Sequence, residues 1–171
     1  MFFDIFIIFA IIFLLFLLSM VWPPDSPWAP WWRTSKKTAR KMCEMAKVKK
    51  GDVVYDLGSG EGTALLVASK EFGANGFGIE IDPLRYLYSK SLLKINGLSS
   101  RVRVKRGNLF NENFSKADVI FVYLVPKTLN RLLPKFKKEL KKGTRIVSYR
   151  YEMGLPLKEY DKKNQIRIYV I

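Results

Sequence analysis

The chain has 171 residues, enough for one domain with a hydrophobic core, and a formal net charge of +15. It has no histidine and one cysteine, which excludes a disulfide framework, a thiol or histidine-ligated zinc site, and Ser-His-Asp or Cys-His catalysis. Residues 1–32 contain Asp4 and Asp25 and no Lys or Arg, so residues 33–171 carry all 30 basic and 13 acidic residues, or +17. Such an excess favours anionic surfaces such as lipid head groups, RNA or acidic protein, or it is only a solvated surface.

Residues 1–22 are almost entirely apolar, and Ser19 is the only polar side chain between Ile5 and Val21. About 20 such residues span the hydrocarbon core of a bilayer. A signal peptide would carry a positive n-region and a small-residue cleavage site, whereas this segment carries Asp4 and runs into Trp-Pro-Pro. It predicts a retained single-pass transmembrane helix. The basic residues that follow place the C-terminal domain on the cytoplasmic side of the cell membrane: Arg33, Lys36, Lys37, Arg40 and Lys41.

Residues 23–33 are rich in Pro and Trp and predict a stiff linker, because the prolines exclude a continuing helix. The tryptophans suit the head-group level of a bilayer, or they pack on the following domain; the sequence leaves both open. Residues 34–171 are expected to form one domain. Its first helix is predicted over 35–46, capped by Thr34 or Ser35, with a buried stripe of Ala39, Met42, Cys43 and Ala46.

The stretch 53–82 carries the strongest pattern in the chain. Val53–Leu57 is typical of a strand covered on both faces, and the glycine-rich run Gly58-Ser59-Gly60-Glu61-Gly62 cannot continue it. Thr63–Phe72 has helical character, and Gly76–Ile81 predicts a second strand. The result is a βαβ unit with its loop at the carboxyl edge of the sheet, where open α/β sheets bind ligands.

The residues around this loop distinguish between two nucleotide-like ligands. Gly58 and Gly60 fit the dinucleotide pattern G-x-G-x-x-G, and Glu80 is suitably placed, but Thr63 occupies the third glycine position. Asp56 would face the phosphates of a dinucleotide, which is a like-charge conflict. S-adenosylmethionine carries an ammonium and a sulfonium and no phosphate, so Asp56 favours S-adenosylmethionine as the cofactor.

Alternating strands and helices continue to the C-terminus and imply a mainly parallel sheet with helices on both faces. The expected helices cover 83–95 and 127–142, and the expected strands cover 102–104, 117–123, 144–151 and 165–171, with a short partner around 157–160.

The helix expected over 127–142 has two notable features. Pro134 lies inside it and is expected to split or kink it. Its outer face is very basic, which indicates either solvation or contact with anionic lipid. The basic residues of this face are Arg131, Lys135, Lys137, Lys138, Lys141 and Lys142.

With these motifs in this order, the chain resembles class I S-adenosylmethionine-dependent methyltransferases. The motifs are the DLGSGEG turn, Glu80, the Gly-Asn-Leu loop at 107–109 and the ADVIFVYLVP strand. More narrowly, it is similar to prokaryotic relatives of the lysine methyltransferases that act on adenine nucleotide translocase and the ATP synthase c-subunit. That resemblance includes the YLVPKTLNRLLPKFKKEL and TRIVSYRY segments. It implies a Rossmann-like fold, a mainly parallel sheet with an antiparallel C-terminal strand.

The resemblance also implies roles for individual residues. Asp56, Gly58, Ser59 and Gly60 would hold the methionine end of the cofactor, Glu80 the ribose hydroxyls, and Ile81, Asn108 and Leu109 the adenine. Thr34 and Ser35 would close over the cofactor, and no metal is expected. The acceptor motif departs from the Asn-Pro-Pro-Tyr type, since Tyr123-Leu124-Val125-Pro126 stands in its place. Tyr123 is the candidate for lining the acceptor site, or it belongs to the core.

The resemblance predicts a membrane-anchored protein-lysine N-methyltransferase whose substrate is a lysine-containing protein at the membrane. Nucleic acid is not the expected partner. The alternatives are a methyltransferase of a lipid, quinone or RNA, and a cofactor-binding module without robust turnover. Methyl transfer is an in-line displacement that depends on positioning, so no dedicated strong base is expected.

Overall fold

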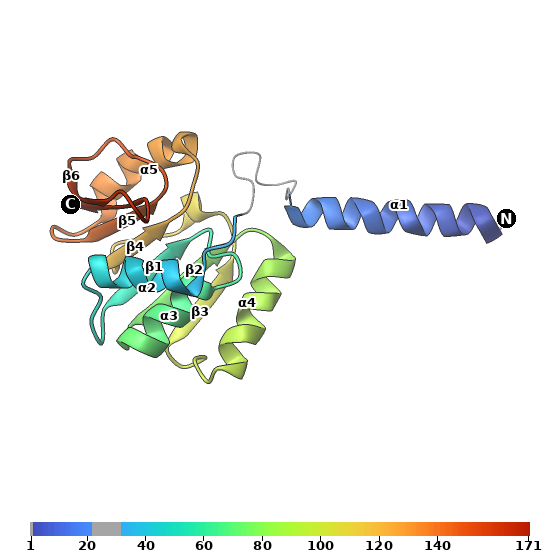
Figure 1. Ribbon diagram of the computed structural model, residues 1–171, viewed down its shortest axis with the longest axis horizontal. Helices are drawn as coiled ribbons and strands as arrows, with labels where there is room; N and C mark the ends of the chain where they lie inside the picture. The colour runs from blue at the N-terminus through green and yellow to red at the C-terminus, as the bar shows by residue number, and fades with distance from the viewer. Residues whose placement is uncertain (1, 22–31) are drawn as a thin grey trace.

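A seven-stranded sheet in the order β3-β2-β1-β4-β5-β7-β6 organises the protein (Figure 1). The computed structural model describes residues 2–21 and 32–171. Strands β1 to β5 run parallel, and β7 is antiparallel to both of its neighbours. The strands are β1 (Val53–Leu57), β2 (Asn75–Glu80), β3 (Val102–Arg106), β4 (Val119–Val122), β5 (Arg145–Tyr149), β6 (Leu157–Asp161) and β7 (Ile166–Val170). The predicted Rossmann-like sheet with an antiparallel C-terminal strand is therefore confirmed.

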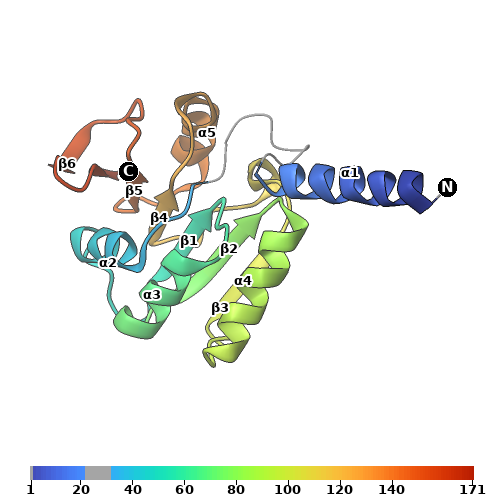
Figure 2. The same cartoon turned by 45° about the vertical axis from the view of Figure 1, so that its right-hand side comes forward.

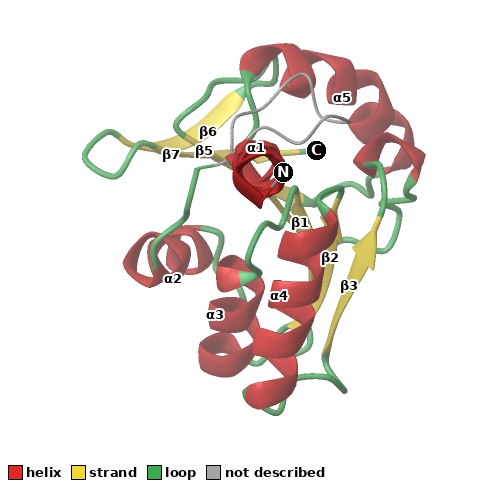
Figure 3. Cartoon of the chain, turned by 90° about the vertical axis from the view of Figure 1, so that its right-hand side faces the viewer, coloured by secondary structure: helices red, strands yellow, loops and turns green. Residues whose placement is uncertain are grey.

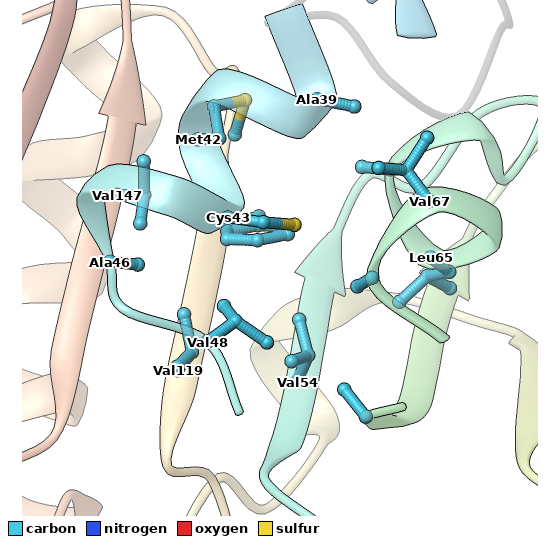
Figure 4. Packing of buried hydrophobic residues seen from close by; sticks show 14 of the residues in the cluster. Ala39, Met42, Cys43, Ala46, Val48, Val54, Leu65, Val67, Val119 and Val147 are labelled. Carbon is cyan, nitrogen blue, oxygen red and sulfur yellow. The ribbon is translucent and has the colours of Figure 1, made fainter. Parts of the chain in front are cut away.

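Three helices cover one face of this sheet: α2 (Lys36–Met45), α3 (Thr63–Phe72) and α4 (Pro83–Ile95) (Figure 2). The predicted stripe of α2 is buried, and Figure 4 shows its Met42 and Cys43 beside side chains of β1, β4 and α3. Ser35 caps this helix, because its side chain accepts a hydrogen bond from the Thr38 N–H. Packing of α2 on α3 brings the segment that precedes α2 toward the glycine-rich loop.

The opposite face is covered by α5 (Pro126–Glu139), as Figure 3 shows. Leu129, Leu132 and Phe136 of this helix are fully buried against Ile120 and Ile146 of β4 and β5. A short 3₁₀ turn, η1 (Leu109–Asn111), and the loop after it stand between β3 and β4. Alternating residues of β1 contribute to the cores on both faces of the sheet. Val54 packs in the core with α2, α3 and α4, whereas Tyr55 and Leu57 pack in the core with α5.

Pro134 does not split α5, which continues through it to Glu139. Proline removes the N–H that would bond to the carbonyl of residue 130. Both Pro134 and Asn130 are exposed, so water can satisfy that carbonyl. The helix ends before Lys142, three residues earlier than predicted, with Leu140 in an extended conformation.

The apolar N-terminal segment forms helix α1 (Phe2–Val21), whose side chains are described for residues 3–17. Among the residues so described, no helix is both long and apolar enough to cross a membrane. The predicted transmembrane anchor is therefore not supported by the structure. Most of the predicted linker lies outside the described residues, and of its tryptophans only Trp32 is described.

Candidate functional site

A cavity of about 380 Å³ lies at the carboxyl ends of β1, β2 and β4. On one side of β1 the sheet continues with β2 and β3, and on the other side it continues with β4 and β5. The strand order therefore reverses at β1, and open α/β sheets bind ligands at such a switch point. The volume is within the range of about 300–1,000 Å³ usual for small-molecule sites. All the residues predicted to bind the cofactor, together with Tyr123, line it: Asp56, Gly58, Ser59, Gly60, Glu80, Ile81, Asn108 and Leu109. The structure thus brings the predicted residues together, while their individual cofactor contacts stay predictions.

The glycine-rich loop forms one wall of the cavity. Gly58 and Gly60 have φ values of 78° and 53°, a conformation that glycine adopts without steric cost. The N–H groups of Gly58 and Ser59 both donate to the Ile79 carbonyl, at 2.9 and 3.0 Å, which ties the loop to β2. Gly62 does not line the cavity and is the residue before α3, so it serves the start of the helix.

Asp56 is the most perturbed carboxylate of the site. It lies near the carboxyl end of β1 and is 8% exposed. Burial, and secondly the negative charge of Glu80, raise its pKa from 3.8 to about 7. Among the described residues, no hydrogen-bond donor or cation pairs with its carboxylate. A buried carboxylate in this state is a strong attractor for a ligand cation such as an ammonium or sulfonium.

Glu80 is held in a fixed orientation at the end of β2. Its Oε2 accepts from the Gly60 N–H at 2.6 Å, and its Oε1 accepts from the Asp82 N–H at 2.9 Å. Burial raises the pKa of Glu80, although these two N–H groups act in the opposite direction. Each carboxylate oxygen keeps a further lone pair. Glu80 can therefore both brace the glycine loop and accept hydrogen bonds from a ligand diol.

Of the residues predicted to contact adenine, Ile81 directly follows β2, and Asn108 and Leu109 lie after β3. Asn108 follows β3 and its Oδ1 accepts from the Phe110 N–H at 3.0 Å, which starts the η1 turn. This leaves the amide N–H₂ of Asn108 as its unused donor group, with one lone pair left on the oxygen. On the far side of the turn, the Arg131 guanidinium stacks 4.5 Å from the Phe110 ring centre. Helix α5 thus closes this side of the cavity.

Two buried hydroxyl groups, Ser59 Oγ and Thr128 Oγ1, belong to residues that line the cavity and have no hydrogen-bond partner among the residues that the structure describes. Buried polar atoms are normally paired, so orphaned ones that line a cavity indicate a ligand with polar groups. Together with the unneutralised Asp56 they suit a ligand that carries both cationic and hydrogen-bonding groups. S-adenosylmethionine fits this description. Among the residues the structure describes, no cluster of acidic, Cys or His side chains could hold a metal ion.

Several lining residues were not found from the sequence, including Trp32, Met42, Arg85 and Thr128. They come from helices α2, α4 and α5 and from the segment before α2, and their position at the cavity depends on how these helices pack on the sheet, so no local pattern marks them. Arg33 is another, and its guanidinium bonds the Glu61 carboxylate of the glycine loop. This ion pair joins the segment before α2 to the loop. Thr34 lines the cavity as predicted, whereas Ser35 caps α2 and does not.

Tyr123 directly follows β4, half-buried, with its side chain on the cavity wall. Partial burial raises the pKa of its hydroxyl, with the Arg150 charge acting in the opposite direction. The phenol is therefore protonated at neutral pH and is not a ready proton acceptor. This agrees with a site that positions its acceptor rather than deprotonating it with a strong base.

Comparison with known proteins gives a consistent family. The family model of the ANTKMT methyltransferase domain matches residues 56–156. A protein-lysine N-methyltransferase of Saccharolobus islandicus (strain REY15A) is 38% identical over 121 residues, which are 70% of this chain and 75% of that protein. The lysine N-methyltransferase of the ATP synthase c-subunit from Xenopus laevis is 28% identical over 99 residues, which are 58% of this chain and 43% of that protein.

A solved structure shares both sequence and fold with the chain. It is the crystal structure of an RNA methyltransferase from Salinibacter ruber in complex with S-adenosyl-L-homocysteine, 33% identical with a TM-score of 0.77. The match covers 82% of this chain and 94% of that one. The bound product of the cofactor in that protein supports the ligand inferred for the cavity.

Proposed function

The chain belongs to the ANTKMT methyltransferase domain family and is an S-adenosylmethionine-dependent methyltransferase, and we propose that its acceptor is a lysine side chain of a protein. The observation that carries the proposal is the 38% identity to a protein-lysine N-methyltransferase over 70% of the chain. Lysine methyltransferases of the ATP synthase c-subunit are also among the relatives of the chain.

The cavity has the groups that this reaction needs. The amine nitrogen of the acceptor would attack the methyl carbon of S-adenosylmethionine in line and displace the sulfur, so that the C–S bond breaks, a neutral thioether leaves, and the methylated amine releases a proton to water. Asp56 would bind the cationic methionine end, the glycine loop with Ser59 would orient it, and Glu80 would hold the ribose. These residues fix the position of the methyl carbon, which is the main contribution to this type of reaction.

A lysine acceptor must first lose its proton. Removing the proton from an amine with a pKa of about 10.4 at pH 7 costs about 4–5 kcal/mol of free energy. A neighbouring sulfonium and removal from water both lower the pKa of the amine. The site therefore needs no histidine as a base. The protonated Tyr123 hydroxyl can instead form a hydrogen bond that positions the acceptor.

The proposal is tested by incubating the full-length protein with native membranes and cofactor labelled with tritium in the methyl group. Label on a protein band that mass spectrometry locates on lysine supports the proposal. Label in the organic extract shows a lipid or quinone acceptor instead. Cofactor binding without any transferred label shows a binding module without robust turnover.

RNA is the second candidate acceptor. Two observations favour it: the 33% identity to an RNA methyltransferase and the net charge of +17 on residues 33–171. The same labelling experiment with total RNA separates the two, because ribonuclease-sensitive label would identify RNA as the acceptor. A protein acceptor predicts label that resists ribonuclease and is removed by protease.

We further propose that α1 attaches the protein to the cell membrane as a single-pass anchor, with the catalytic domain in the cytoplasm. The support is the exposure of its apolar side chains, among them Phe3 at 74%, Phe6 at 70% and Phe9 at 67%. Five basic residues between 33 and 41 suit the cytoplasmic side. A membrane substrate would then be within reach of the cavity.

Membrane flotation of the full-length protein tests the anchor. A matched variant that lacks residues 2–31 should move to the soluble fraction with unchanged cofactor affinity. The deletion stops before Trp32 because this residue lines the cavity. Full-length protein that stays soluble would refute the anchor without affecting the proposed reaction.

A further inference from the structure

A cluster of aromatic rings lies beside the cofactor cavity and surrounds one cation. The rings belong to Tyr123, Tyr149, Tyr151 and Trp32, and the cation is the guanidinium of Arg150. Its central carbon is 5.5 Å from the ring centre of Tyr149, 5.8 Å from that of Tyr123 and 5.9 Å from that of Trp32. The Tyr123 ring also packs against Tyr149 edge-on at 4.6 Å and against Tyr151 at 6.1 Å.

The backbone at Arg150 is arranged to place this guanidinium over the rings. Successive side chains of a strand point to opposite sides, so a continued β5 would separate Arg150 from Tyr149. Arg150 instead has a φ of 67°, which is uncommon for a residue other than glycine. Its N–H donates to the Gln165 carbonyl, and its own carbonyl accepts from the Arg167 guanidinium, both at 2.8 Å. The strand ends here, and these bonds hold the turn.

The position of the cluster connects it with methyl transfer. Two of its rings, Trp32 and Tyr123, also line the cofactor cavity. Arg150 is exposed, and no described carboxylate forms an ion pair with it; its guanidinium is held by the aromatic rings and by a hydrogen bond with the Tyr149 side chain. Aromatic faces attract any cation within about 6 Å of the ring centre, and alkylammonium groups are recognised in this way.

We propose that these four rings form the subsite for the ammonium group of the acceptor lysine, and that Arg150 occupies this subsite until the lysine displaces it. The inference rests on the proposed lysine acceptor and names its binding site. A methylated ammonium is still a cation, so the same rings would retain the product for a further methyl transfer. The lysine would approach past Arg150 and reach the cavity between Trp32 and Tyr123.

Binding of tetramethylammonium chloride to the full-length protein, saturated with S-adenosylhomocysteine, tests the subsite without any turnover. tert-Butanol, which has a similar shape and no charge, is the control ligand. Arg150→Ala should bind the cation about 2- to 30-fold more tightly than the wild type, because a competing cation–π interaction of about 0.5–2 kcal/mol is removed. Binding of tert-butanol should be unchanged.

A pair of substitutions at one ring completes the test. In the Arg150→Ala background, Tyr123→Leu should weaken cation binding about 2- to 30-fold, whereas Tyr123→Phe, which keeps the ring, should not. Unchanged cation affinity in Arg150→Ala, or equal affinities in Tyr123→Leu and Tyr123→Phe, would overturn the subsite. Arg150 is exposed, so its variant provides a result even if Tyr123→Leu does not fold.

Failure of the subsite and failure of the proposed lysine acceptor give different results in these experiments. Cation binding that follows these variants, in a protein that labels only RNA, refutes the lysine acceptor and with it the assignment of the subsite to lysine. Lysine methylation whose KM is the same in the wild type, Arg150→Ala and Tyr123→Leu keeps the proposed function and overturns the subsite.

Discussion

Replacing Asp56 with Asn should make the cofactor-free protein more stable and should greatly weaken cofactor binding. The buried carboxylate has a pKa of about 7 against an ordinary value of 3.8, so the folded protein binds this proton more tightly than the unfolded chain. Stability contributed by this group therefore falls as the pH rises from about 4 to about 7. A rise of about three pKa units corresponds to about 4 kcal/mol of destabilisation above pH 7. Asn carries no charge and avoids this cost.

Urea unfolding of both proteins at two pH values measures the effect. The stability advantage of Asp56→Asn should grow by about 2 kcal/mol between about pH 5.5 and about pH 8.5, because the wild-type carboxylate ionises over that range. Calorimetric titration with S-adenosylmethionine should show at least about 30-fold weaker binding by the variant, as expected when a buried charge pair loses one partner. Wild-type affinity should fall as the pH drops below about 7, with uptake of a proton on release.

Asp118→Asn is a matched control, at the residue directly before the neighbouring strand β4. Burial pushes the pKa of Asp118 upward, but the Val53 N–H and the Lys141 ammonium outweigh it and hold the pKa below its ordinary value. Loss of this carboxylate should therefore lower stability at neutral pH and leave cofactor affinity unchanged. The reasoning about Asp56 is refuted if Asp56→Asn destabilises the cofactor-free protein at pH 8.5 or binds the cofactor as the wild type does.

Three further predictions follow from the packing of the site. Gly78→Ala should lower the free energy of unfolding by about 1–3 kcal/mol, measured with urea, because the added Cβ would lie 2.8 Å from the buried Leu65 Cδ1. An unchanged free energy of unfolding would show that the packing around Leu65 can relax. Burial raises the pKa of the Cys43 thiol to about 12, so iodoacetamide at pH 8 should modify it only after unfolding, and rapid labelling of the native protein detected by mass spectrometry would contradict this. Arg33→Gln should raise the cofactor Kd by no more than about fivefold, since water screens an ion pair made by an exposed guanidinium; an additive effect of Glu61→Gln would show that the two do not act together.

The parts of the fold that could be predicted from the sequence are those set by local pattern. Strand β1 was predicted with its observed bounds, because its five residues are apolar or buried in succession and a glycine with positive φ follows them. Helix α3 was also predicted with its bounds, since glycines flank it in left-handed conformations. Strands β4, β5 and β7 are shorter than predicted at both ends, β2 begins and ends one residue earlier than predicted, and β3 and β6 extend past their predicted C-terminal ends.

The cofactor side of the cavity could be predicted where its residues belong to a local sequence pattern, and not where they depend on tertiary packing. The predicted cofactor-binding residues lie at the carboxyl ends of β1, β2 and β3 or in the loops that follow them. The parallel arrangement of these strands is therefore enough to bring the residues together at one edge of the sheet. Thr128 was missed because its hydroxyl reaches the cavity through the packing of α5, whose position depends on contacts with β4 and β5. Arg33 was assigned to the membrane side, whereas it also pairs with the glycine loop. Contacts of this kind depend on tertiary packing.

The acceptor side shows why a departure from a family motif can be explained only in three dimensions. In the run Tyr123-Leu124-Val125-Pro126, Leu124 is buried, and a Cβ added at Gly58 would lie 3.3 Å from its Cδ2, so this residue backs the cofactor loop. Val125 precedes α5, and Pro126 occupies its first turn, where a missing N–H costs nothing. Leu124 also lines the cavity, but its side chain has no group that attracts a cation, so Tyr123 is the residue expected to face an acceptor. In the proposed subsite it does so with rings that follow β5 and with Trp32, so recognition of the acceptor depends on three segments and not on one contiguous motif.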